Sequence, residues 1–168
     1  MSARYNKYDI VYTSAYTLIE ILVTLTIIGL LFSFGYVNFR DFSRRQAVAD
    51  AAKSIQGDLR IAQTDATTGQ KPADGSCSLP KTLDGYNFEV FPPAEYKIEA
   101  ICGVTTTVVK DVTLPAGISV TAPSPNPLQF KVLGQGTNIS SGSWVLTLTQ
   151  EGTNNTTAVT VNSGGDIQ

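Results

Sequence analysis

The sequence contains no histidine among its 168 residues. It therefore lacks a histidine general base, the Ser-His-Asp and Cys-His nucleophile pairs and any imidazole ligand for zinc. Two cysteines, Cys77 and Cys102, are too few for a four-thiolate metal site. These absences disfavour most classes of enzyme, and the sequence predicts no catalytic residue, no metal and no other cofactor.

Charged residues are also scarce, at 15% of the chain, against about 25% in ordinary soluble domains. Twelve basic and fourteen acidic residues give a net charge of -2, which attracts phosphates and anionic lipids only weakly. No arginine follows Arg60, and from Lys71 onward acids outnumber lysines. Nucleic-acid binding needs clustered positive charge, so nucleic acid is not an expected partner.

Residues 18–37 form a long apolar run whose one charged side chain is Glu20. A helix of this length spans about 30 Å of hydrocarbon, so the run predicts a membrane-spanning helix. A removable signal has a shorter apolar region of about 7–15 residues that ends at an A-x-A-like site. The run ends instead in Asn38, Phe39 and Arg40, and we expect the segment to be retained.

The pattern becomes one-sided after Phe39. Apolar residues recur at helical spacing, which predicts an amphipathic helix that packs on the domain after it; they are Val48, Ala52, Ile55, Leu59, Ala62 and Ala66. No proline interrupts residues 16–67, and Gly69 and Pro72 follow as a stop signal. We therefore expect one helix from Tyr16 to about Thr67.

Beyond residue 80 the chain is rich in Val, Thr, Ile and Phe, with Gly, Pro and Asn between the runs. Short runs of this kind predict an antiparallel sheet with one packed face; they are residues 86–90, 96–100, 104–114, 118–121, 128–132, 144–149 and 158–161. Glu95, Lys97 and Glu99 alternate with Tyr96 and Ile98, which indicates a solvated strand face. Residues 137–157 are crowded with Ser, Thr and Asn, as is typical of an exposed loop or edge.

The residues from Ala15 to Glu20, with the sequence AYTLIE, resemble the processing site of type IV pilins and of the related pseudopilins of type II secretion. The resemblance implies that a membrane peptidase cuts between Ala15 and Tyr16, that the new N-terminus at Tyr16 is methylated, and that Glu20 is the acid at the fifth mature position. The family usually has glycine before the cut, where this chain has Ala15. Major pilins often have proline where this chain has Val37.

The family's fold is α+β: a long N-terminal helix, with a membrane-spanning first half and an amphipathic second half, packed on a C-terminal antiparallel sheet domain. Carried onto this chain, residues 1–15 are a cleaved leader, 16–39 and 40–67 are the two helix halves, and 68–168 are the sheet domain. A weaker resemblance to H-type pseudopilins and minor pilins covers 114–120, 128–130 and 158–167. Some of those relatives bind DNA near their end through basic residues, where this chain has Asp166.

The resemblance implies a structural subunit of a type IV pilus or pseudopilus that serves surface attachment, motility or secretion. Its partners would be the prepilin peptidase, other pilin subunits, the assembly platform and, before assembly, the membrane. The precursor would be a single-pass protein of the cytoplasmic membrane, and the assembled subunit would lie in an extracellular pilus or a cell-envelope pseudopilus. An ionisable residue in an apolar helix is a functional candidate, and Glu20 could pair with the amine of a neighbour's Tyr16 in the filament.

Two other readings stay open. One is a membrane-tethered enzyme, which the missing histidine disfavours. The other is a membrane-anchored extracytoplasmic binding module that does not polymerise, in which Glu20 has no role. Cys77 and Cys102 flank the first predicted hairpin; an exported domain favours a disulfide, while a reducing compartment would leave two buried thiols.

Overall fold

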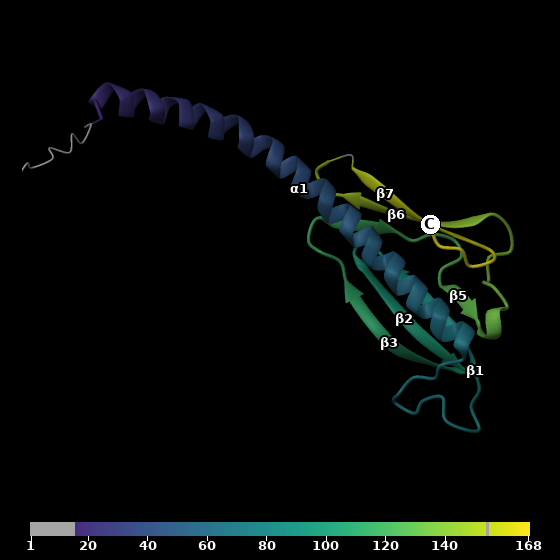
Figure 1. The fold of residues 1–168 in the computed structure, drawn as a ribbon. Helices are drawn as coiled ribbons and strands as arrows, with labels where there is room; N and C mark the ends of the chain where they lie inside the picture. The colour runs from purple at the N-terminus through teal and green to yellow at the C-terminus, as the bar shows by residue number, and fades with distance from the viewer. Residues whose placement is uncertain (1–15, 154) are drawn as a thin grey trace, which may run out of the picture. The chain divides into compact units, whose positions relative to one another are not determined.

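The computed structural model describes residues 16–153 and 155–168, with the backbone alone at 34–41. It is an α+β protein, as predicted, and Figure 1 shows its elements. The chain divides into the units Met1–Asp41 and Phe42–Gln168, each of which is described by itself. The elements are α1 (Leu18–Thr68), β1 (Leu83–Phe91), β2 (Glu95–Cys102), β3 (Thr105–Thr113), β4 (Ile118–Thr121), β5 (Leu128–Lys131), η1 (Val132–Gly134), β6 (Ser143–Gln150) and β7 (Thr156–Asn162).

The helix ends where the sequence predicts. Gly69 adopts a φ of 68°, in the left-handed region that suits glycine. The N–H of Gly69 donates to the carbonyl of Ala66, and the N–H of Gln70 donates to the carbonyl of Asp65. These two bonds form a Schellman motif, which satisfies the last carbonyls of the helix.

The strands form two antiparallel sheets rather than the single sheet predicted from their pattern. One has the order β3-β2-β1-β5 and the other the order β4-β6-β7. All seven predicted strands are present, but alternation of apolar and polar residues along a strand does not show which strands pair.

The burial of β6 contradicts a second prediction. This strand is the central strand of the smaller sheet and buries Trp144, Leu146 and Leu148, although residues 137–157 were expected to form an exposed loop or edge.

One core joins the second half of α1 to both sheets. The six apolar helix residues predicted to pack on the domain are all buried, at exposures of 3% or less. Phe88 of β1 stacks on Tyr96 of β2, with ring centroids 4.9 Å apart. Phe88 also meets Trp144 of β6 edge-on at 5.9 Å, so aromatic contacts link the two sheets.

The outer face of β2 is solvated, as predicted. Lys97 lies 3.2 Å from Asp111 of β3, and its Nζ lies 5.3 Å from the centroid of the Phe91 ring. Such exposed ion pairs contribute little stability, typically about 1 kcal/mol or less. The Lys97–Asp111 pair is therefore a minor contribution to the stability of the sheet.

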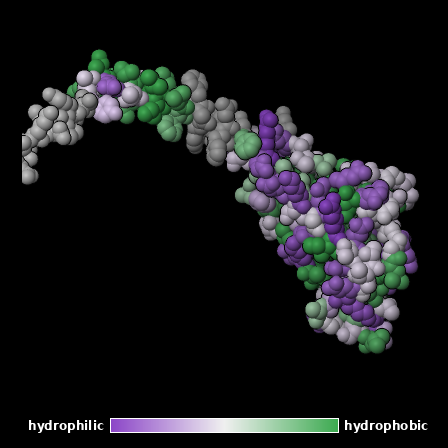
Figure 2. Space-filling model, viewed as in Figure 1, coloured by the Kyte–Doolittle hydropathy of each residue, from purple (hydrophilic) through white to green (hydrophobic). Residues whose placement is uncertain are grey.

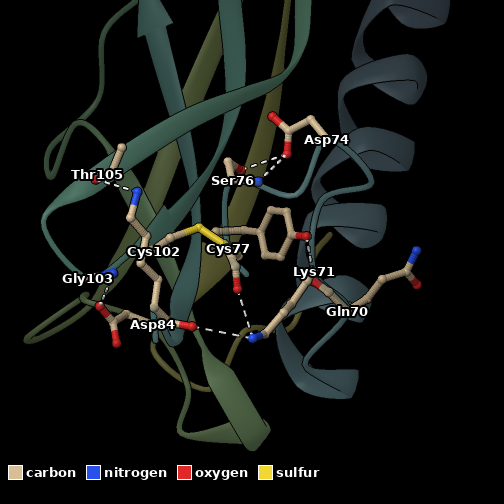
Figure 3. The surroundings of a disulfide bond; sticks show 11 residues. Gln70, Lys71, Asp74, Ser76, Cys77, Asp84, Cys102, Gly103 and Thr105 are labelled. Carbon is tan, nitrogen blue, oxygen red and sulfur yellow. Dashed lines mark hydrogen bonds between the residues drawn. A yellow bond between two sulfur atoms is a disulfide. The ribbon is translucent and has the colours of Figure 1, made fainter. Parts of the chain in front are cut away.

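A disulfide joins Cys77, in the loop after α1, to Cys102 at the end of β2. Figure 3 shows that Lys71 ties the same loop, since its Nζ donates to the carbonyl of Cys77 at 2.9 Å. The hydroxyl of Tyr86 donates to the carbonyl of Gln70 at 2.7 Å, and burial together with the charge of Asp65 raises the pKa of Tyr86. The end of α1 is thus fastened to the first hairpin by both covalent and polar contacts.

The disulfide yields a stability prediction. Replacing both Cys77 and Cys102 by serine should lower the free energy of unfolding by about 3 kcal/mol, because the unfolded chain regains the entropy of the open loop. Urea unfolding of the full chain in mild detergent, followed by the fluorescence of the single Trp144, would measure this change.

The wild-type chain with its disulfide reduced is the matched control and should unfold at the same lowered urea concentration. An unchanged midpoint in both samples would show that the bridge contributes no stability.

Candidate functional site

The candidate site is the N-terminal end of α1, where the sequence predicts processing and assembly. The helix begins at Leu18 because Thr17 caps it: the N–H of Glu20 donates to Oγ1 of Thr17 at 3.3 Å, and the carbonyl of Thr17 accepts from Glu20 and Ile21. The pattern T-x-x-E is the sequence signature of a capping box. That signature is present in the sequence but was not among the predicted features.

Glu20 therefore lies in the first helical turn, where a negative charge interacts favourably with the helix dipole. Tyr16 directly precedes the cap and is 77% exposed. Ala15, on the other side of the predicted cut, lies outside the described residues. The predicted pairing of Glu20 with Tyr16 joins two copies of the chain, so a single chain does not test it.

The surface of this helix segment is apolar on every side. Every described side chain from Tyr16 to Ser33 is exposed, and Figure 2 shows the largely apolar surface of the segment. Its large apolar residues are 47–83% exposed; they are Tyr16, Leu18, Ile19, Ile21, Leu22, Val23, Leu25, Ile27, Ile28, Leu30, Leu31 and Phe32. A helix that is hydrophobic all round belongs in a protein core or a membrane.

The hydroxyl groups of this segment bond within the helix. Oγ1 of Thr24 donates to the carbonyl of Ile21 at 2.9 Å, and Oγ1 of Thr26 donates to the carbonyl of Leu22 at 2.6 Å. Such back-bonding satisfies threonine hydroxyls without water. In surroundings with little water, the threonine hydroxyls therefore keep their hydrogen bonds. The charge of Glu20 is costly there unless it finds a partner.

Over the residues whose side chains are described, which leave out 34–41, no helix is both long enough and apolar enough to cross a membrane. The membrane-spanning half predicted for residues 16–39 therefore stays a prediction.

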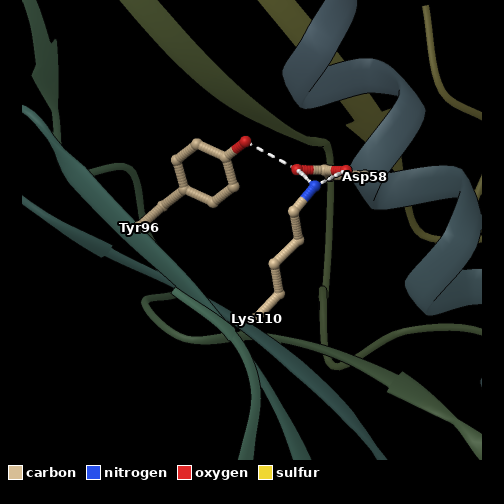
Figure 4. A network of polar contacts seen from close by, with 3 residues as sticks. All are labelled: Asp58, Tyr96 and Lys110. Carbon is tan, nitrogen blue, oxygen red and sulfur yellow. Dashed lines mark hydrogen bonds and ion pairs between the residues drawn. The ribbon is translucent and has the colours of Figure 1, made fainter. Parts of the chain in front are cut away.

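A second polar constellation fastens the helix to the larger sheet within the unit Phe42–Gln168. Asp58, only 4% exposed, lies on the buried face of α1. Its carboxylate accepts bonds from Nζ of Lys110 on β3 at 2.7 and 2.8 Å and from the hydroxyl of Tyr96 on β2 at 2.6 Å (Figure 4). Burial, followed by the bond to Asp58 and its charge, raises the pKa of Tyr96 well above its usual value, so the phenol stays a donor.

Asp58 was not among the residues predicted from the sequence. The available signal was an acid between Ile55 and Leu59 on the apolar face of the helix. A buried charge requires a partner, but the sequence does not indicate that Lys110, 52 positions away, supplies it.

The C-terminal end of the chain also contacts α1. Nε2 of Gln63 donates to the carbonyl of Gly165 at 2.9 Å. Gly165 adopts a φ of 96°, and a Cβ there would lie 2.6 Å from that same nitrogen. The turn before the C-terminus therefore needs glycine at this position to reach the helix.

Among the side chains that the structure describes, at 16–33, 42–153 and 155–168, no group of three or more from His, Cys, Asp or Glu is placed to hold a metal ion. The structure brings Cys77 and Cys102 together as a disulfide, and it places Tyr16 and Glu20 at one helix end. What this arrangement offers chemically is association: an exposed apolar helix with one acid near its start.

Comparison with known proteins gave no match among family models, curated proteins or solved structures.

The Asp58 network yields an asymmetric prediction. Lys110→Met leaves a buried carboxylate with only Tyr96 as its partner and should cost about 3 kcal/mol, at the lower end for a broken buried pair because Lys110 is half exposed. Asp58→Asn should cost less, about 1 kcal/mol, because the freed ammonium group of Lys110 can turn to water. Urea unfolding at pH 7, followed by Trp144 fluorescence, would rank the two.

Lys97→Met is the matched control, because it breaks the exposed pair with Asp111 and should cost less than about 1 kcal/mol. Equal effects of Lys110→Met and Lys97→Met would mean that the Asp58 network does not hold the helix on the sheet.

Proposed function

We propose that this chain is a pilin-like structural subunit that polymerises through the N-terminal part of α1. The precursor is held in a membrane by this apolar helix, is cut before Tyr16 and methylated there, and then enters a filament whose core consists of packed helices. The sheet domain forms the filament surface. The filament serves attachment, motility or secretion.

The observation that carries the proposal is the exposed apolar surface of α1 from Tyr16 to Phe32. Burying one Leu, Ile or Phe side chain yields about 1.5–3 kcal/mol. Summed over the large apolar residues of the segment, the gross gain is on the order of 20 kcal/mol. A segment with this driving force needs a partner surface or a bilayer.

Bilayer and filament core suit the same side chains, because both contain little water. Thr24 and Thr26 bond their hydroxyls to carbonyls of their own helix, so they tolerate either surrounding, and such residues are common between packed helices in membranes. Transfer from one to the other therefore exchanges lipid contacts for contacts with other helices. Motion during assembly comes from other chains in this proposal.

Glu20 supplies specificity in this proposal. A carboxylate in apolar surroundings is costly unless a cation meets it. Cleavage before Tyr16 creates such a cation, the amine of the new N-terminus, on each neighbouring subunit. Pairing of the two charges in a medium of low dielectric constant sets how far one subunit is shifted along the filament relative to the next.

The second unit fits the role of an outer domain. It has a continuous core of its own and a disulfide, so its fold does not depend on burying the apolar helix segment. Disulfides persist in oxidising compartments outside the cytosol. This supports export of the sheet domain across the membrane that holds the helix.

The competing function is a membrane-anchored binding module that does not polymerise. It uses the same apolar helix but gives Glu20 no partner. The two functions therefore differ in what a change at Glu20 does.

Glu20→Ala and Glu20→Gln, introduced in the native host, should leave processing before Tyr16 intact and lower the amount of assembled filament at least tenfold. The reason is the lost charge pair, since about 1.4 kcal/mol in subunit affinity corresponds to a factor of ten. Immunoblots of the sheared surface fraction against the membrane fraction would measure the ratio.

Glu99→Gln is the matched control, because it removes a carboxylate from the solvated face of β2 and should leave the ratio unchanged. Wild-type amounts of filament in both Glu20 variants would favour the binding module.

A further inference from the structure

The four outer strands of the two sheets differ in how their free edges are covered. Segments of this chain bond to three of these edges. Residues 136–138 cover β5, Pro93 accepts from the N–H of Val120 on β4, and the C-terminal Gln168 exchanges two backbone bonds with Thr160 on β7. Uncovered edges are hazards that proteins usually block.

β3 is the exception. Over residues 16–153 and 155–168, no other segment forms backbone hydrogen bonds to the side of β3 that faces away from β2. The strand is nine residues long, so its outward N–H and C=O groups form a row that another strand can pair with.

Only the first half of this edge is suited to pairing. A bulge at Val109 interrupts the register with β2, and the next two residues are charged. Lys110 is held by Asp58 and Asp111 by Lys97. Bulges and charges are the usual means of blocking a strand edge, and here they block the second half of β3 but leave residues 105–108 open.

Together with Val104, which lies in the turn between β2 and β3, these residues read VTTTV, which is the same in both directions about Thr106. Val104 and Val108 are exposed at 105% and 50%. Thr106 and Val108 pair with Ile101 and Glu99 on the outer face of β2, whereas Thr105 and Thr107 pair with the buried Cys102 and Ala100. The exposed side chains of Thr106 and Val108 thus lie on one face of the strand.

We propose that residues 104–108 are a pairing site for the same segment of a second copy of this chain. The two segments run antiparallel about a twofold axis at Thr106, which places Val104 opposite Val108 of the second copy and Thr105 opposite Thr107. Val–Val and Thr–Thr pairs of this kind stabilise a sheet, and no like charges meet. The paired edges form a continuous sheet of eight strands, four from each copy.

The symmetry separates this contact from the helix-mediated assembly proposed above. Pairing about a twofold axis uses the same patch on both copies and closes after two, whereas a filament grows by contacts between two different patches. The pairing site therefore does not depend on the proposed function, and either can fail alone.

Thr106→Cys tests the pairing directly. The native cysteines are bridged, so the new thiol is the free one, and opposite Cβ atoms in paired strands lie about 4.5–5.5 Å apart. Full chain in mild detergent under a mild oxidant should form covalent dimers at least fivefold more than Val145→Cys, whose exposed side chain lies on the central strand β6. If the chains associate through the apolar helix alone, the two variants should form covalent dimers in equal yield.

The register gives a second readout. A mixture of Val104→Cys and Val108→Cys chains should form more mixed dimer than either variant forms dimer alone, because the two positions face each other across the twofold axis. Thr106→Asp, which places like charges opposite each other, should abolish dimer formation by Val104→Cys with Val108→Cys. Equal yields for Thr106→Cys and Val145→Cys, or no excess of the mixed dimer, would overturn the proposal.

Discussion

Apolar surface on every side of α1 between Tyr16 and Phe32 must be removed from water, and the other features of the molecule follow from this constraint. Burying its side chains is favourable, at about 1.5–3 kcal/mol for each large apolar residue. The segment contributes no residue to the core of the rest of the chain. Residues Phe42–Gln168 have a core that uses only the second half of the helix.

The second half of α1 is fixed to its domain by contacts of three kinds. Apolar residues such as Ile55 and Leu59 are fully buried. Asp58 is paired with Lys110 and Tyr96. The loop that directly follows the helix is joined to β2 by the disulfide. Buried charged networks are often no more stable than apolar packing, but they demand one particular geometry. Within this unit, the Asp58 network is made in one rotation of the helix over the larger sheet, the one in which Asp58 faces Tyr96 and Lys110.

The sequence predicted those features that depend on neighbours along the chain. The helical spacing of Val48 to Ala66, the stop at Gly69 and the strand pattern are all local, and the structure confirms them. The split into two sheets, the central place of β6 and the partners of Asp58 depend on residues far apart in the sequence. The polar side chains around Trp144 suggested an exposed segment because they occupy the outward positions of a strand whose inward positions are buried.

The central claim is that the chain is processed and assembled as a pilin-like subunit. The most direct measurement is the intact mass, with mapping of the N-terminal peptide, of the protein from native membranes or sheared surface material. The account predicts a chain that starts at Tyr16 and carries one additional methyl group. A chain that still starts at Met1 or Ser2 would contradict it, and the apolar helix would then be an anchor for a protein that does not polymerise.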